Sequence, residues 1–176
     1  PVYYGSVTKT VHKRMETTVN DLVCTLANIK TTVTLTKDLQ ELFMTDTQAD
    51  AAGKERLTVA LSIGDSRLVF DRATADAGTA GYFKAVEALN TVKIVLSGEY
   101  NKAASDEAPQ YVPVNWTTEI VGCKAGQWRK VSIGILNADE GNVQFQVKVE
   151  NWVYDRKVDV DITQLYAFGE ETIPDE

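Results

Sequence analysis

Apolar and polar residues alternate along most of this chain, and this pattern limits the folds open to it more than any other feature. Successive side chains of a β-strand point to opposite faces, so strict alternation gives a strand one apolar face. The clearest example runs from Val112 to Ile120, with Trp116 at its centre. Further alternating segments lie at residues 7–11, 22–26, 29–35, 57–63, 92–96, 131–135, 143–149 and 158–162.

Turn residues rather than helices separate most of these segments, which favours antiparallel pairing. Because each strand is apolar on only one face, two sheets are expected to pack face to face. The sequence therefore predicts an all-β fold, an antiparallel Greek-key β-sandwich of about ten strands. One short helix is expected near residues 37–44, with Thr36 as its N-cap. Residues 45–55 and 71–81 are expected to be loops.

Composition limits the classes of partner. The chain has 176 residues, of which 44% are hydrophobic, so it can bury a core without help from metals or disulfides. Its formal net charge of −7 disfavours both nucleic acid and anionic membrane surfaces as partners. No apolar run approaches the roughly 20 residues that a transmembrane helix needs.

The alternation supports one domain followed by a short tail. We expect residues 1–168 to form a single β-sandwich domain. Residues 169–176 are acidic and poor in apolar side chains, which indicates a tail or a linker towards a downstream region. The sequence begins at Pro1 in a strand-like stretch, so the lack of a visible signal peptide says nothing about the compartment.

The cysteines and the single histidine give little support for nucleophilic or metal chemistry. Cys24 is in phase with Leu22 and Leu26, so it is expected to point into the core. Cys24 and Cys123 are interpreted as two small buried hydrophobic residues, with one disulfide bridge as the alternative. His12 lies in a polar stretch and is interpreted as a solvated turn residue. A structural zinc site needs about four cysteine or histidine ligands, so no metal is expected.

Paired carboxylates are the nearest approach to a catalytic site. Asp159 and Asp161 are two residues apart on a predicted strand, so their side chains share a face. Such pairs can act in glycosidases or bind Ca²⁺, but cleft and calcium-loop patterns are lacking. A charged solvent face of an edge strand is the simpler interpretation. We expect no catalytic residues and no cofactor, since no glycine-rich phosphate loop is present either.

Aromatic residues are the remaining candidates for binding. Trp116, Trp128, Trp152 and Tyr154 all lie in strand-like segments. Trp116 belongs to the apolar face of its strand, which predicts a position in the core. Trp152 and Tyr154 are out of phase with the preceding apolar face, which predicts either a bulge or exposure. Exposed aromatic rings can stack on sugars, whereas ordinary packing is the alternative.

Four segments together resemble a known domain family. They are "VCTLANIKTTVTLTKDLQELF", "LVFDRATADAGTAGYFKA", "CKAGQWRKVSIGI" and "GNVQFQVKVENWVYDRKVDVDI", in that order along nearly the whole chain. They resemble the blocks of a family of unknown function from surface lipoproteins of gut Bacteroidetes. That family looks related to the fimbrillin-like proteins, which are transthyretin-like β-sandwiches. The resemblance implies export and a lipidated N-terminus upstream of Pro1, with a location on the outer membrane or outside the cell.

The resemblance also implies a mode of assembly. Fimbrillins polymerise by β-strand donation, in which one subunit completes the sheet of the next. Many are cut after a basic residue behind the first strand, and Lys13 and Arg14 stand in a comparable position. A basic hairpin turn explains these two residues equally well.

Three hypotheses follow. The first is a non-enzymatic cell-surface module for adhesion or for assembly of fimbria-like structures. The second is an accessory domain of a carbohydrate-binding or carbohydrate-processing surface lipoprotein. The third is a hydrolase that uses Asp159 and Asp161. The expected partners are other surface proteins, glycans or further copies of this chain, with membrane contact only through an upstream lipid anchor.

Overall fold

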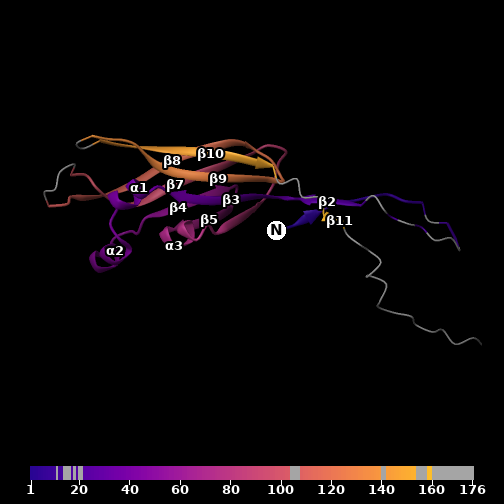
Figure 1. Cartoon of the computed structure of the whole chain (residues 1–176), viewed down its shortest axis with the longest axis horizontal. Coiled ribbons are helices and arrows are strands. Elements are labelled where there is room, and N and C mark those ends of the chain that lie inside the picture. The colour runs from indigo at the N-terminus through magenta and orange to yellow at the C-terminus, as the bar shows by residue number, and fades with distance from the viewer. Residues whose placement is uncertain are drawn as a thin grey trace, which may run out of the picture.

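In the residues that it describes, the computed structural model shows a mostly β protein of eleven strands and three short helices (Figure 1). It describes residues 1–10, 12–13, 17, 19, 22–103, 108–139, 142–153 and 158–159. The predicted tail, residues 169–176, lies outside this described part. The prediction of an all-β sandwich is confirmed.

Two four-stranded sheets form the sandwich. The order in one sheet is β10 (Asn142–Val153), β9 (Gln127–Asp139), β3 (Asn28–Leu35) and β6 (Ala80–Lys84). The order in the other is β5 (Ser66–Asp71), β4 (Thr58–Ile63), β7 (Asn90–Asn101) and β8 (Tyr111–Cys123). Three hairpins, β4–β5, β7–β8 and β9–β10, therefore stay within one sheet, while the connections β3–β4, β5–β6, β6–β7 and β8–β9 cross between the two sheets.

One strand pair departs from the expected antiparallel pattern. β3 and β9 run parallel, in a register that extends from Lys30 opposite Trp128 to Leu35 opposite Ile133. Parallel neighbours need a long crossover connection, and here the chain passes through the opposite sheet between the two strands. Alternation alone reports which face of a strand is buried and carries no information on the direction of its neighbour.

The core lies between the two sheets and contains the residues that the alternation selected. The side chains of Ile29 and Val33 in one sheet and of Leu61 and Ile94 in the other are fully buried. On β7 the inward residues are buried, while their sequence neighbours Thr91 and Lys93 are exposed. The period of two therefore predicted the packed faces correctly.

The expected helix near residues 37–44 is confirmed as α1 (Lys37–Leu42), which follows Thr36. The expectation of plain loops at residues 45–55 and 71–81 was wrong. These segments contain α2 (Asp46–Ala52) and α3 (Arg72–Asp76). Each of these helices begins with a capping box, in which a side chain at the start and another three residues later satisfy each other's backbone N–H groups.

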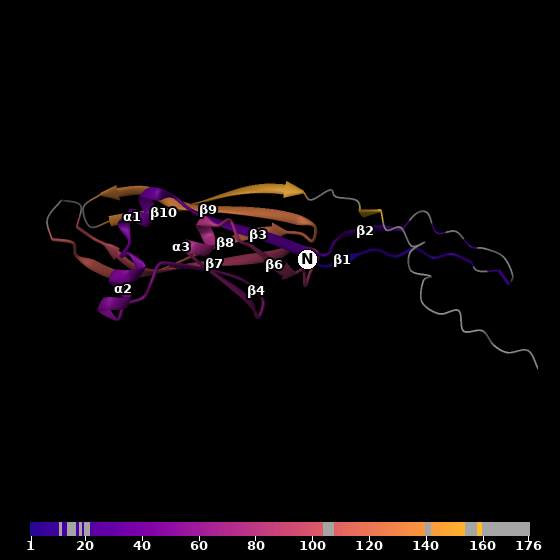
Figure 2. The ribbon, with the colours of Figure 1, turned by 60° about the horizontal axis from the view of Figure 1, so that its bottom comes forward.

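A small three-stranded sheet extends the molecule beyond the sandwich. It contains β1 (Tyr3–Tyr4), β2 (Val23–Leu26) and β11 (Val158–Asp159), with β2 in the middle. In both views it projects from one end of the sandwich (Figures 1 and 2). The expected strand over residues 7–11 was wrong for its described part, since residues 5–10 belong to no strand. We call residues 1–10 together with β2 the N-terminal arm.

Candidate functional site

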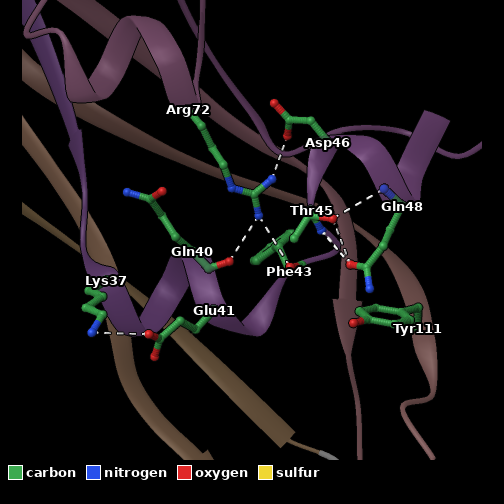
Figure 3. A pocket seen from close by; sticks show the side chains of 9 residues that line it. All are labelled: Lys37, Gln40, Glu41, Phe43, Thr45, Asp46, Gln48, Arg72 and Tyr111. Carbon is green, nitrogen blue, oxygen red and sulfur yellow. Dashed lines mark hydrogen bonds and ion pairs between the residues drawn. The ribbon is translucent and has the colours of Figure 1, made fainter. Parts of the chain in front are cut away.

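The three helices and the first residue of β8 enclose an open groove of about 640 Å³. It lies at the end of the sandwich opposite the N-terminal arm (Figure 1). Figure 3 shows the side chains that line it. Lys37, Gln40 and Glu41 come from α1, and Thr45, Asp46 and Gln48 come from the start of α2. Phe43, Arg72 and Tyr111 complete the lining, and we call this space the helix groove.

Arg72 holds the helix groove together. Its Nη1 donates to Oδ1 of Asp46 at 2.6 Å, and its Nη2 donates to the carbonyl oxygens of Gln40 at 3.0 Å and Phe43 at 3.3 Å (Figure 3). The last carbonyl groups of a helix have no partner within the helix, so the guanidinium satisfies the end of α1. The Arg72 side chain is only 15% exposed, and its hydrogen bonds link α3 to both α1 and α2.

The capping box at the start of α2 fixes Gln48. Its amide Oε1 accepts the backbone N–H of Thr45 at 2.9 Å, and its own backbone N–H donates to Oγ1 of Thr45 at 3.3 Å. With Oε1 engaged, the amide Nε2 remains a donor with no hydrogen-bond partner among the described residues. The second carboxylate oxygen of Asp46 is an acceptor that likewise has no hydrogen-bond partner among the described residues. The helix groove therefore presents a fixed donor at Gln48 and a fixed acceptor at Asp46, and Figure 3 shows these two groups apart, with Thr45 between them.

The charges of the helix groove balance. Lys37 pairs with Glu41 at 3.5 Å on the exposed rim, and Arg72 pairs with Asp46 inside. Two cations therefore meet two anions, and the groove carries no formal net charge. Tyr111 lies beside Gln48 and away from the Lys37–Glu41 pair in Figure 3. This arrangement suits a ligand that offers both hydrogen-bond donors and acceptors and a nonpolar surface for the tyrosine ring.

A second groove, of about 520 Å³, runs between the edge strands β8 and β10. Trp116, Ile120 and Phe145 are among its apolar walls, and all three are partly exposed. The rings of Trp116 and Phe145 lie 5.7 Å apart between centroids. Arg129, 5% exposed, donates from Nη2 to the carbonyl oxygen of Gly122 at 3.0 Å at the inner end. Thr118, Glu119 and Arg129 add polar atoms to the apolar walls of this groove, which lies at the edge of the sandwich.

The tryptophans that the sequence singled out are engaged in packing where the structure describes them. Trp116 packs against the core, as predicted. Trp128 lies on the outer face of its sheet, with the ammonium groups of Lys30 and Lys130 at 3.7 and 4.7 Å from its ring centroid. These cation–π contacts place two lysine side chains over the ring, where a stacking sugar would have to lie. The side chain of Trp152 and all of Tyr154 lie outside the described residues.

The two cysteines are free and occupy different environments. Cys123 is fully buried in the core, and burial raises the pKa of its thiol, with Arg129 acting in the opposite direction. Cys24 was expected in the core of the sandwich, and this was wrong. It is half-buried on β2 in the N-terminal arm, where Leu26 on the same face is the buried residue. Both thiols are free in the structure, so the disulfide alternative was wrong.

The remaining candidates are exposed or not described. His12 and Lys13 are exposed between β1 and β2. Arg14, Asp161 and the side chain of Asp159 lie outside the described residues, so the processing site and the carboxylate pair stay predictions. Within the described part of the chain, no three histidine, cysteine or acidic residues are grouped closely enough to hold a metal ion.

Sequence reasoning did not find the helix groove. Lys37, Gln40 and Glu41 lie in the predicted helix, but Thr45, Asp46, Gln48 and Arg72 lie in segments interpreted as loops, and Tyr111 was not singled out. The available signal was the pair of capping boxes, which spaces Thr45 from Gln48 and Asp71 from Thr74 by three residues. Those motifs predict where the two helices start but not that the helices converge on one groove.

In the described residues, no helix combines the length and apolar character that crossing a membrane requires. No curated protein and no solved structure matches the chain. Residues 1–164 match a family described as a domain of unknown function, DUF4493. This match spans both sheets and the N-terminal arm, and the chain therefore belongs to the DUF4493 family.

Proposed function

We propose that this chain is a non-enzymatic module of the cell surface that takes part in adhesion or in the assembly of surface structures. The observation that carries the proposal is the N-terminal arm, which extends from an otherwise well-packed sandwich (Figure 2). Its apolar side chains are left open to solvent: Tyr4 is 69% and Val2 59% exposed. Exposed apolar groups gathered on one projecting element are typical of a protein contact.

The backbone of the arm supports the same proposal. β1 forms an outer edge of the small sheet, because β2 pairs with it on one side only. An open strand edge offers unpaired N–H and C=O groups to a strand from another chain. The resemblance to fimbrillin-like surface lipoproteins agrees with this use of an edge. Surface proteins and further copies of this chain are therefore the proposed partners.

Self-association tests the assembly part of the proposal. The intact chain is expected to form concentration-dependent oligomers in light scattering coupled to size-exclusion chromatography. Replacing Tyr4 and Val23, both exposed on the arm, with alanine should shift the distribution towards the monomer. Leu136→Ala is the matched control, because Leu136 is 64% exposed on β9, outside the arm. A strictly monomeric protein, or an equal effect of the control, would count against assembly through the arm.

Location tests the surface part of the proposal. Externally added protease should cleave the full-length protein in intact cells, and metabolic labelling with a fatty acid should tag it upstream of Pro1. Full protection in intact cells, with cleavage only after lysis, would contradict a surface location. A periplasmic marker protein serves as the control for envelope integrity.

A second candidate function is an accessory domain of a carbohydrate-binding or carbohydrate-processing surface lipoprotein. The helix groove favours it, because a tyrosine ring lies there beside the fixed amide of Gln48, and the fixed carboxylate of Asp46 lines the same groove (Figure 3). Aromatic rings with neighbouring polar side chains are suited to sugar rings, which have C–H faces and hydroxyl rims. A glycan array probed with the intact protein tests this candidate, and an array without signal would contradict it.

A further inference from the structure

We propose that the helix groove binds a neutral saccharide, with Tyr111 as the stacking surface and Gln48 and Asp46 as the hydrogen-bonding groups. This inference rests on the second candidate function and names its site and ligand class. It does not depend on the N-terminal arm, which lies at the other end of the sandwich (Figure 1).

Tyr111 provides the apolar part of the site. It is the first residue of β8, is partly exposed and lines the helix groove. β8 pairs with β7 through Asn101 opposite Tyr111, so the backbone beneath the ring belongs to a sheet and not to a free loop. A ring held by a sheet loses little conformational freedom when a sugar stacks on it.

Gln48 and Asp46 provide the polar part. The Oε1 atom of Gln48 is held by Thr45, which leaves the amide Nε2 to donate to a hydroxyl group. Oδ1 of Asp46 is held by Arg72, which leaves the second carboxylate oxygen to accept from one. A sugar hydroxyl both donates and accepts, so hydroxyls on successive units of an oligosaccharide can use these two separate groups. Because both side chains are already fixed, binding orders few new rotamers.

The charge pattern selects a neutral ligand. Arg72 directs its guanidinium to Asp46 and to two carbonyl groups, so it is committed to the protein. Lys37 is paired with Glu41 on the rim. An anionic ligand would meet the carboxylates of Asp46 and Glu41, and a cationic one would meet Lys37 and Arg72. An uncharged polyhydroxyl compound avoids both conflicts.

The size and openness of the groove agree with this class of ligand. Its volume of about 640 Å³ falls within the range of small-molecule sites. The groove is open to solvent along its rim, where Lys37 is 90% exposed. An open groove accepts part of a longer chain, so an oligosaccharide fits this site better than a ligand that must be enclosed.

Calorimetric titration of the intact chain tests the inference. The probes are soluble oligosaccharides of glucose, xylose, mannose and galactose, with oligogalacturonate and inorganic phosphate as anionic probes. We expect at least one neutral oligosaccharide to bind and neither anion to do so. Tyr111→Ala should weaken that binding about tenfold, the loss expected for one stacking contact. Tyr111→Phe keeps the ring and should retain most of the affinity.

The controls separate a lost contact from a lost fold. Tyr82→Ala removes an exposed tyrosine from β6, away from the helix groove, and should leave binding unchanged. Every variant is compared with the parent by its melting temperature and far-ultraviolet circular dichroism. Gln48→Ala gives an independent readout, since it removes the donor and keeps the tyrosine ring.

Three outcomes would overturn the inference. They are failure of every neutral oligosaccharide to bind, preference for an anionic probe, and binding that Tyr111→Ala and Gln48→Ala both leave intact. In the last case the glycan array can still be positive, so the accessory function survives while this site fails. An array without signal would contradict both the accessory function and this saccharide site. The protease experiment on intact cells reports on surface location alone.

Discussion

Oδ1 of Asn28 accepts the backbone N–H of Val2 at 2.5 Å, and this contact joins the N-terminal arm to the sandwich. The amide Nδ2 of the same residue donates to the carbonyl oxygen of Phe83 at 3.3 Å, on the neighbouring strand β6. Asn28 is 8% exposed and follows Ala27, whose N–H donates to the carbonyl oxygen of Val2 at 2.8 Å. One buried side chain therefore connects the first residues of the chain with two strands of the core.

Replacing Asn28 with alanine is expected to loosen the arm. The change leaves the buried carbonyl group of Phe83 without its side-chain donor, which costs about 1–3 kcal/mol in the free energy of unfolding. Backbone amides of Val2 and Ala27 should then exchange faster with deuterium. Denaturant unfolding and hydrogen exchange measure the two effects. Asn115→Ala on the exposed face of β8 should change neither, and an equal response of both variants would contradict the role of Asn28.

The sequence predicted the packed faces of the strands well because an apolar residue at every second position marks the buried face of a strand. Ile29 and Val33 are in phase in the sequence and fully buried in the structure. The alternation does not indicate the direction in which a strand runs or the strand with which it pairs. The parallel pairing of β3 with β9 depends on contacts between segments about a hundred positions apart, which a local pattern cannot report.

The arm and the helix groove were missed for related reasons. Cys24 has the phase of a core residue, but its strand lies beyond the sandwich, so the side chain is only half-buried. Phase describes the face of a strand and not the sheet to which that strand belongs. In the groove, Arg72 and Asp46 come from two segments interpreted as loops, and only folding brings them to 2.6 Å. Their contact has no local signature.

The two thiols should react at very different rates in the native protein. Iodoacetamide needs an accessible thiolate, and Cys123 is fully buried with a raised pKa. Cys24 is half-buried and should be alkylated first. Mass spectrometry of the peptides at increasing times measures the order. Cys24→Ser should abolish the fast phase, and simultaneous labelling of both cysteines without denaturant would contradict the placement of Cys123 in the core.

Two glycines with a positive φ should differ in their tolerance of alanine. Gly98 has a φ of +143°, and a Cβ atom there would lie 3.0 Å from the Cα of Leu57 and 3.1 Å from the ring of Phe43. Gly53 has a φ of +63° at the end of α2, with no atom within 4 Å of such a Cβ. Gly53→Ala should therefore cost only the backbone term of about 1 kcal/mol.

Gly98→Ala adds a steric conflict with backbone atoms to that backbone term. We expect it to lower the free energy of unfolding by about 2–3 kcal/mol. Chemical denaturation of both variants against the parent gives the comparison. Equal losses would show that the space above Gly98 relaxes more easily than the structure indicates.

Acid should weaken the protein partly through the N-cap of α3. Oδ1 of Asp71 accepts from the hydroxyl of Thr74 at 2.7 Å and from its backbone N–H at 2.8 Å. These hydrogen bonds, the side-chain one first, hold the pKa of Asp71 below its ordinary value of 3.8. A carboxyl whose pKa is lowered by folding stabilises the folded state fully above its unfolded-state pKa. That contribution is lost as the pH falls through the lower, folded-state pKa.

Asp71→Asn separates the charge from the cap. Asparagine caps helices about as well as aspartate, so stability at pH 7 should change little, whereas Asp71→Ala should lose about 1 kcal/mol. Below pH 3.8 the asparagine variant should lose stability less steeply than the parent, because it has no carboxylate to protonate at this cap. Melting temperatures between pH 7 and pH 2.5 measure the slopes. Asp65→Asn removes a carboxylate from the exposed β4–β5 turn, so a matching slope change in that variant would assign the effect to net charge and not to the cap.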